Sequence, residues 1–321
     1  MSDALVDIQG LSRHFPTRGG RVLRAVDEVS LAIAEREVVG LVGESGSGKS
    51  TLGKTVLGLW PKTQGSVRYR GELLPAKYGA ADFQRHAQRM QMIFQDPYSS
   101  LNPRMTVGEI IGEGLRLHSS LTRAEIDARV QDWLARVGLH PSHAGRYPHE
   151  FSGGQRQRIG IARALVMEPE FVVCDEPISA LDVSVQAQVV NLLDELKRSL
   201  NLTLLFIAHD LSMVRYVSDR MAVMYLGALV EVGPADDVFF TPKHPYTQML
   251  VAANPEPDPV SERARRSAPL TGEIPSPLQV ASGCRFAARC PHVTPQCRAE
   301  VPAMRTVPGT AVQVACHLYA D

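Results

Sequence analysis

The sequence predicts an α/β fold organised around a phosphate-binding loop. An apolar run from Val38 to Val42 leads directly into a glycine-rich loop, and a helix-like stretch from Thr51 to Leu59 follows it. Two further apolar runs lead into polar residues: Phe171 to Asp175 leads into Glu176, and Leu202 to Ala208 leads into His209. Short apolar runs with such boundaries are typical of buried strands. We therefore expect a buried sheet with the loop at the end of one strand.

The loop has the pattern G-x-x-x-x-G-K-[ST]. Its residues are Gly43, Glu44, Ser45, Gly46, Ser47, Gly48, Lys49, Ser50 and Thr51. Glycines let the backbone N–H groups converge on phosphate oxygens, and the following helix N-terminus adds partial positive charge. Lys49 can reach the β- and γ-phosphates, and the Ser50 hydroxyl can bind Mg²⁺. A turn without a ligand would not require the Lys-Ser pair, so we predict a nucleoside triphosphate site.

Composition and the distribution of apolar residues limit the binding partners and the cellular location that we expect. Lys plus Arg and Asp plus Glu number 34 each, so no strong field attracts nucleic acid or an anionic membrane. The first residues lack the basic and apolar regions of a secretory signal. No apolar run approaches the ~20 residues of a membrane span. We expect a cytosolic chain that a membrane protein can hold by contact.

The N-terminal segment predicts strands. Leu5 to Arg13 alternates apolar and polar residues, as an edge strand does, and Val26 to Ile33 predicts another strand. Phe15 lies between them and ahead of the phosphate loop. An aromatic ring in this place can stack on a base. It can equally be a core residue at a strand end, and spacing alone does not decide.

The segment from Val107 to Leu165 has helical periodicity. Gly138 is expected to end one of its helices. We interpret residues 96–165 approximately as a helical subdomain inserted into the α/β core. Within it, Ser152, Gly153, Gly154 and Gln155 fall at a helix start, where exposed N–H groups favour an anion. A simple N-cap with a flexible loop is the alternative.

Polar residues also end the predicted core strands. Gln95 follows Met90 to Phe94 and can offer its side-chain oxygen to a metal or a water, although a plain strand-ending residue is commoner. Asp175 can hold Mg²⁺ through water, and Glu176 can accept a proton from the attacking water. His209 follows the strand Leu202 to Ala208. It is a candidate γ-phosphate sensor, although most single histidines are structural.

The C-terminal part differs in composition. Of 22 prolines, 13 lie from Pro234 onward, so we place a domain boundary between residues 1–233 and 234–321. Four of the five cysteines cluster there, at Cys284, Cys290, Cys297 and Cys316. Four thiolates can bind zinc or an iron–sulfur cluster, but the close C-x₂₋₄-C pairs usual for zinc are absent. Unliganded cysteines are the third alternative, and Cys174 is interpreted as a small core residue.

Together these residues resemble the ATP-binding subunits of ABC transporters. The similarity spans Met1 to about Val232 and includes Gln95, the Ser152 to Gln155 signature, Asp175-Glu176, Ser179 to Asp182 and His209, in family order. It implies the phosphate-loop NTPase (RecA-like) α/β fold with an inserted helical subdomain, an N-terminal antiparallel β subdomain and a small Pro/Cys-rich extension. It also implies two cassettes stacked head to tail. In that arrangement the signature of one caps the ATP γ-phosphate held by the other.

The resemblance also implies roles for single residues. Phe15 corresponds to the adenine-stacking aromatic residue, and Ser50 and Gln95 correspond to Mg²⁺ ligands. Asp175 corresponds to the water-mediated metal ligand and Glu176 to the general base.

Three further residues complete the implied site. Asp182 corresponds to the turn that crosses to the other subunit and His209 to the switch histidine. Lys49 of the phosphate loop is expected to contact the β- and γ-phosphates.

A narrower resemblance points to the dipeptide/oligopeptide importers. It is carried by Gln95 to Arg104, by Tyr147 to His149, by His244 to Thr247 and by an extension from Gly283 to His317. The chain is more similar to the second, dipeptide-type ATPase subunit. The subfamily implies a 4Fe–4S cluster on the four cysteines, a different second ATPase subunit, two transmembrane permease subunits and an extracytoplasmic peptide-binding protein. It also implies a peripheral location on the cytoplasmic face of the inner membrane.

Three alternatives follow from the same residues. A soluble ABC ATPase acting on nucleic acid or ribosomes usually has two cassettes or long coiled-coil inserts, which this neutral single cassette lacks. An importer of nickel or an oligosaccharide would differ only in partners. A degenerate cassette that binds ATP without cleaving it is disfavoured by the complete set of Glu176, His209 and the signature.

Overall fold

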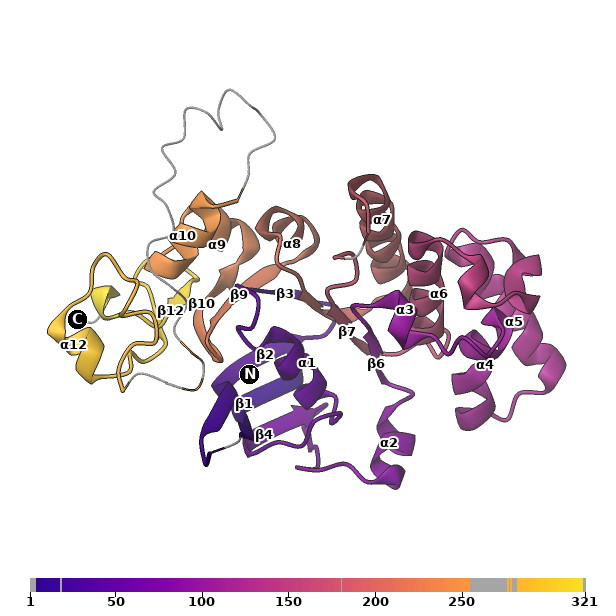
Figure 1. Ribbon diagram of the computed structural model, residues 1–321, viewed down its shortest axis with the longest axis horizontal. Coiled ribbons are helices and arrows are strands. Elements are labelled where there is room, and N and C mark those ends of the chain that lie inside the picture. The colour runs from indigo at the N-terminus through magenta and orange to yellow at the C-terminus, as the bar shows by residue number, and fades with distance from the viewer. Residues whose placement is uncertain are drawn as a thin grey trace. The chain divides into compact units, whose positions relative to one another are not determined.

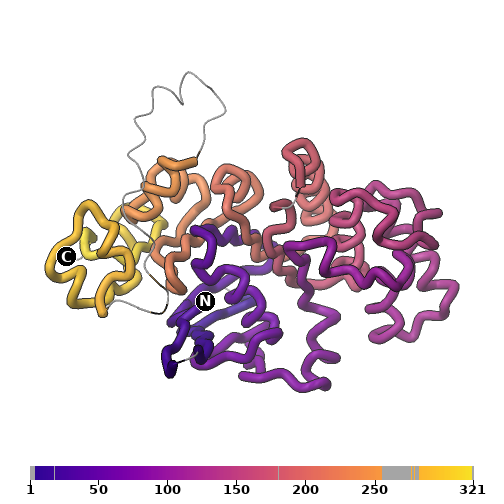
Figure 2. Tube along the Cα trace, in the orientation of Figure 1, coloured from indigo at the N-terminus to yellow at the C-terminus, as the bar shows by residue number. Residues whose placement is uncertain are grey.

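The computed structural model describes residues 4–17, 19–179, 181–254, 276, 278 and 282–319. The chain forms two compact units (Figure 1). The first comprises Met1–Ala34, Val38–Lys77 and Ala208–Asp321, and the second comprises Glu35–Glu37 and Tyr78–Ile207. The indigo N-terminal and yellow C-terminal segments of Figure 2 thus belong to one unit. The boundary at residue 233 stays a prediction.

An antiparallel sheet of four strands forms the N-terminal part of the first unit. Its order is β2 (Val22–Ala34), β1 (Ala4–Pro16), β4 (Gln64–Tyr69) and β5 (Glu72–Leu73). Strand β1 pairs with both β2 and β4, so the expectation of an edge strand was wrong. The alternation of apolar and polar residues shows that one face of the strand is buried. It does not show whether the strand has a neighbouring strand on each side. An antiparallel β subdomain is nonetheless present, as predicted.

The phosphate loop joins strand β3 (Val38–Val42) to helix α1 (Lys49–Val56) in the same unit. Strand β3 is fully buried and runs parallel to β9 (Arg220–Tyr225), which forms an antiparallel hairpin with β10 (Ala228–Pro234). The C-terminal segment adds β12 (Gln313–Val314) to β10, and β11 (Arg305–Thr306) to β12. Short helices complete the unit: α8 (Leu211–Val217), α9 (Ala235–Phe240), α10 (Pro245–Ala252), α12 (Pro295–Ala299) and η3 (His317–Tyr319).

The second unit contains three parallel strands. Strand β7 (Phe171–Asp175) lies between β6 (Met90–Ile93) and β8 (Thr203–Ile207), and all residues of β7 and β8 are buried. Such buried and largely apolar strands are typical of a parallel sheet covered on both faces. The α/β fold that the sequence predicts is therefore confirmed.

Helices make up the rest of the second unit, as the periodicity predicts. They are α2 (Ala80–His86), α3 (Pro97–Ser100), α4 (Val107–His118), α5 (Arg123–Arg136), η1 (Pro141–Gly145), η2 (Pro148–Glu150), α6 (Gly153–Leu165) and α7 (Val183–Leu200). The apolar stripe of α5 includes Trp133, which is fully buried. Gly138 follows α5 with a φ of 72° and ends it, as expected. Among the described helices, none has the length and apolar character to cross a membrane.

Helix α10 begins at a buried histidine. Nδ1 of His244 accepts a hydrogen bond from the Tyr246 N–H at 3.0 Å, which caps the helix. The His244 N–H donates to Glu231 Oε2 at 2.8 Å, and only 2% of His244 is exposed. Because burial disfavours the charged imidazolium, the pKa of His244 is lowered to about 4. The cap requires the neutral ring.

This histidine makes folding dependent on pH. The unfolded state binds the proton with a pKa of about 6.5 and the folded state with one of about 4, so stability falls as the pH decreases between these values. We expect the imidazole to contribute about 3 kcal/mol to that loss. Denaturant unfolding at a series of pH values measures it. In His244→Gln the loss over this window should be smaller, and an identical pH profile would contradict the assignment.

Candidate functional site

The phosphate loop has the backbone conformation that its glycines predict. Gly48 has a φ of 105°, and a Cβ atom there would lie 2.0 Å from the Ala25 carbonyl oxygen. Any larger residue would both strain the backbone and collide with the chain. The Gly227 N–H donates to the Ser47 carbonyl at 2.8 Å, so the loop is also hydrogen-bonded to the β9–β10 turn.

Lys49 lies inside the curve of this loop. Only 4% of the residue is exposed, and Nζ donates to the carbonyl oxygens of Gly43 at 2.8 Å and Glu44 at 3.0 Å. Helix α1 starts at Lys49 and has no acidic residue in its first turn. Ser50 is the second residue of that turn. A buried lysine, glycine-shaped backbone and an acid-free helix start form a cradle for phosphate oxygens.

Phe15 belongs to an aromatic cluster in the same unit. Its ring meets Trp60 edge-on, with centroids 5.4 Å apart, and the Arg13 guanidinium lies 4.2 Å from its centroid. Trp60 is 41% exposed. Sequence reasoning did not identify Arg13 or Trp60, because their contacts with the Phe15 ring arise only in the fold. Such a half-exposed cluster is suited to stacking on a planar ligand.

The second unit brings Gln95 and Glu176 together. The Gln95 side-chain amide donates to Glu176 Oε2 at 2.8 Å, although 81 positions separate them. Glu176 has a φ of 44°, an unfavourable conformation for a residue with a side chain, while its N–H donates to the Ile207 carbonyl at 2.9 Å. Asp175 ends β7 and is 1% exposed. Held carboxylates at the carboxyl edge of a parallel sheet can bind a metal and activate a water.

The signature segment starts a helix, as predicted. Ser152 is the N-cap of α6, its Oγ accepts from the Gln155 N–H at 3.3 Å, and its own N–H donates to Gln155 Oε1 at 3.0 Å. Ser152 itself is exposed. A Cβ atom on Gly154 would lie 2.4 Å from a Val185 methyl carbon, so α6 closely approaches α7. This reciprocal cap orders the tip of the helix and leaves it open to an anion.

Two further predicted residues lie at exposed helix starts. Asp182 precedes α7 in the second unit, and His209 precedes α8 in the first. Ala180, within the predicted turn from Ser179, lies outside the described residues. The first unit therefore carries the phosphate loop, Phe15 and His209. The second carries Gln95, Asp175, Glu176, the signature and Asp182.

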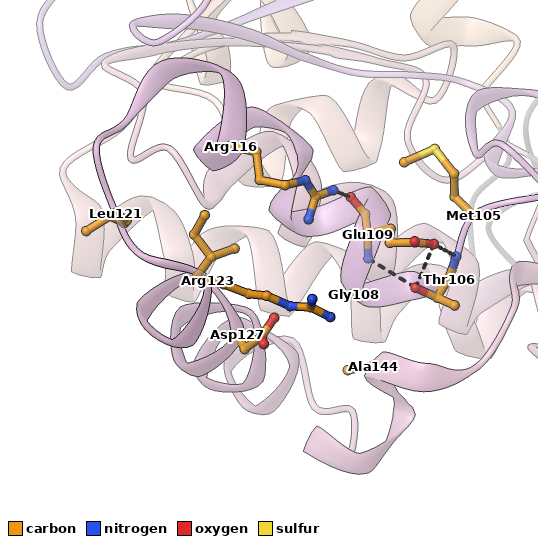
Figure 3. A pocket seen from close by; sticks show the side chains of 10 residues that line it. Met105, Thr106, Gly108, Glu109, Arg116, Leu121, Arg123, Asp127 and Ala144 are labelled. Carbon is orange, nitrogen blue, oxygen red and sulfur yellow. Dashed lines mark hydrogen bonds between the residues drawn. The ribbon is translucent and has the colours of Figure 1, made fainter.

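The helical part of the second unit contains an open cavity of about 710 Å³ (Figure 3). Its wall includes Thr106 and Glu109, which form a reciprocal cap at the start of α4. Hydrogen bonds from Thr106 lower the pKa of Glu109. Because capping the helix accounts for that carboxylate, we assign no catalytic role to this cavity.

All four clustered cysteines line a single cavity of about 90 Å³ in the first unit: Cys284, Cys290, Cys297 and Cys316. Burial raises the pKa of each of three of these thiols, that of Cys284 to about 11. The N–H groups of Phe286, His292 and Leu318 donate to the sulfur atoms two positions earlier. In the described residues, no group of cysteine, histidine or carboxylate side chains is arranged to hold a single metal ion.

The fifth cysteine is different. Cys174 lies on β7 and is fully buried, and burial raises its pKa to about 12. It is a core residue, as the sequence predicts.

Comparison with known proteins places these features in a family. Residues 26–179 match the family described as ABC transporter, and residues 230–297 match the family described as oligopeptide/dipeptide transporter, C-terminal region. The chain is 52% identical over 319 residues to the putative oligopeptide transport ATP-binding protein YkfD of Bacillus subtilis. The alignment covers 99% of this chain and 96% of the relative. The chain is also 50% identical to the oligopeptide transport ATP-binding protein OppF of Salmonella typhimurium, over 94% of this chain and 92% of the relative.

Solved structures agree with the sequence matches. The ATP-binding cassette MJ0796, in a dimeric post-hydrolysis state bound to ADP and Pi, superposes with a TM-score of 0.66 at 26% identity. The match covers 72% of this chain and 98% of MJ0796. The phosphate loop, the signature helix and the match over nearly the whole length lead to one conclusion: the chain belongs to the ATP-hydrolysing ATP-binding subunits of ABC transporters and carries the C-terminal region of the oligopeptide/dipeptide branch.

Proposed function

We propose that the chain is the ATP-hydrolysing subunit that powers an importer of dipeptides or oligopeptides. The observation that carries this is the match over nearly the whole chain to relatives named for oligopeptide transport, including their C-terminal region. The second supporting observation is the complete set of candidate residues, from the Lys49 cradle to the ordered Ser152 tip.

Two cassettes are proposed to close on two ATP molecules. Each ATP would be held by the phosphate loop of one cassette and by the exposed Ser152 tip of the other. The dimeric state of MJ0796 bound to ADP and Pi supports this arrangement. Closure on ATP can drive a conformational change in attached subunits because ATP binds the closed state more tightly than the open one.

The hydrolytic roles follow the family resemblance together with the chemistry of each side chain. Ser50 and Gln95, with Asp175 through water, would bind Mg²⁺, which neutralises phosphate charge. Glu176 would accept the proton of the attacking water, and the hydrogen bond from Gln95 holds its carboxylate. His209 would contact the γ-phosphate. Phe15 would stack on adenine, and Asp182 would mark the turn facing the partner cassette.

The partners are inferred from the importer branch. We propose a second, different ATPase subunit, two transmembrane permease subunits, an extracytoplasmic peptide-binding protein and a peripheral position on the cytoplasmic side of the membrane. The equal numbers of basic and acidic residues support attachment through protein contacts rather than through lipid or nucleic acid.

A comparison of Glu176→Gln with the wild type tests whether Glu176 is the general base and whether the chain powers a peptide importer. In the chain co-purified with its permease subunits, wild-type ATPase activity should rise when the binding protein presents peptide. The variant should lose at least about 100-fold in turnover, because an amide cannot accept the proton, and should still bind ATP. Steady-state hydrolysis and labelled-ATP binding give the two readouts.

Glu168→Gln is the matched control, because Glu168 also has a positive φ, of 52°, and lies in the same unit. Its turnover should stay close to that of the wild type. Undiminished turnover in Glu176→Gln would exclude Glu176 as the base. If no peptide stimulates the ATPase activity of the wild-type complex, the proposed function in peptide import is contradicted.

We propose a 4Fe–4S cluster on Cys284, Cys290, Cys297 and Cys316, with zinc as the alternative. The four thiols share one cavity, and backbone N–H groups donate to three of the sulfurs, a pattern that stabilises thiolate ligands. A single zinc ion needs thiolates about 2.3 Å from one point, and the described residues contain no such group. When bound, the cluster would cross-link four positions of the segment between Cys284 and Cys316.

Cys297→Ser tests the cluster. Protein prepared anaerobically should contain iron in about fourfold molar excess over chain and absorb in the visible blue, and the variant should lose both signals. Cys174→Ser, which changes a buried cysteine in the other unit, should retain them. Stoichiometric zinc without iron would establish the alternative.

A further inference from the structure

The segment that contains the four clustered cysteines, residues 284–316, contacts the phosphate loop directly. Arg289, which precedes Cys290, donates two hydrogen bonds to the two carboxylate oxygens of Glu44, at 2.8 and 3.0 Å. The side chains of Arg289 and Glu44 are only 3% and 18% exposed. Planar two-bond contacts between arginine and carboxylate are strong and directional, more so away from water. A residue 245 positions along the chain therefore fixes the second residue of the loop.

Every polar group of Glu44 is engaged. Its N–H donates to Tyr246 Oη at 2.9 Å, its carbonyl accepts from Lys49 at 3.0 Å, and its carboxylate is held by Arg289. Tyr246 is fully buried and packs on Tyr225, with ring centroids 4.6 Å apart. Because both external partners are themselves buried, they have little freedom to move away from the loop.

A second arginine of the same segment supports the loop at another residue. Arg285 donates to the Leu226 carbonyl and forms an ion pair with Asp27. Leu226 and Gly227 form the β9–β10 turn, and the Gly227 N–H donates to the Ser47 carbonyl at 2.8 Å. The segment from Cys284 to Cys290 thus reaches the loop at Glu44 directly and at Ser47 through one turn.

Charge explains why the Glu44 contact matters for a triphosphate. A carboxylate in the loop repels phosphate oxygens unless a cation neutralises it. Arg289 supplies that cation through its two hydrogen bonds to the Glu44 carboxylate. Without Arg289, the carboxylate of Glu44 would be a partly buried, unpaired charge.

We propose that Arg289 is a positioning residue for the phosphate loop, and that the Cys284–Cys290 segment thereby serves the nucleotide site. The inference rests on the ATP binding stated under the proposed function and adds a residue outside the cassette motifs. It assigns to the cysteine-containing segment a role in nucleotide affinity, in addition to any role in cluster binding.

Arg289→Met tests the proposal in the full-length chain. The variant should bind Mg-ATP about 10- to 100-fold more weakly, the range expected when a charge-assisted hydrogen bond is lost. The KM for ATP should rise with it while kcat stays within about twofold of the wild type, because Arg289 does not touch the reacting atoms. Arg289→Lys should recover part of the affinity, since it keeps the charge and loses the two-bond geometry.

Arg298→Met is the matched control. Arg298 is an exposed arginine next to Cys297, beyond the Cys284–Cys290 segment, and its replacement should leave the affinity unchanged. Thermal unfolding and visible absorbance of each variant show whether the segment remains folded. If Arg289→Met unfolds the segment, the variant Glu44→Gln serves instead, because it removes the same ion pair by changing the residue in the phosphate loop.

The double variant provides the deciding measurement. If the two residues act as a pair, Arg289→Met combined with Glu44→Gln should bind Mg-ATP no more weakly than Arg289→Met alone. Effects that multiply, or a wild-type affinity in folded Arg289→Met, would overturn the proposal while leaving the proposed function intact. A wild-type chain that fails to bind Mg-ATP would overturn both.

Discussion

The phosphate loop depends on backbone hydrogen bonds and close contacts supplied by residues far away in the sequence. Its glycines permit the tight curve, but they also permit many others, and glycine loses more conformational freedom on folding than any other residue. The curve is selected by the Ala25 carbonyl against Gly48, by Gly227 against Ser47 and by Tyr246 against Glu44. These partners all belong to the first unit, so the loop and its support fold as one body.

The candidate chemistry is divided between the two units. The first holds the groups that bind phosphate, and the second holds Glu176 with its hydrogen bond from Gln95, together with the Ser152 tip. Neither unit alone has the complete set. By the proposed mechanism, nucleotide binding and hydrolysis each require groups from both units. ATP that binds the closed state more tightly than the open one can convert its binding into motion.

Much of the site could be predicted from the sequence, because it consists of short motifs on regular elements. The G-x-x-x-x-G-K-[ST] pattern defines its own loop, and the reciprocal Ser152–Gln155 cap is encoded within four residues. The strand assignment of β1 was right but its edge position was wrong, since pairing depends on β4, more than fifty residues later. The roles of Arg289, Tyr246 and Trp60 could not be predicted. Tyr246 and Arg289 lie in segments that carry the importer resemblance, but their contacts with the loop arise only in the folded chain.

Amide hydrogen exchange at Glu44, in protein without added nucleotide, tests the central claim most directly. If the surrounding framework holds the loop in its phosphate-binding conformation, the Glu44 amide bonded to Tyr246 should exchange at least about 100-fold more slowly than an unstructured peptide. Exchange at the unstructured rate until ATP is added would show that the ligand, and not the framework, shapes the loop.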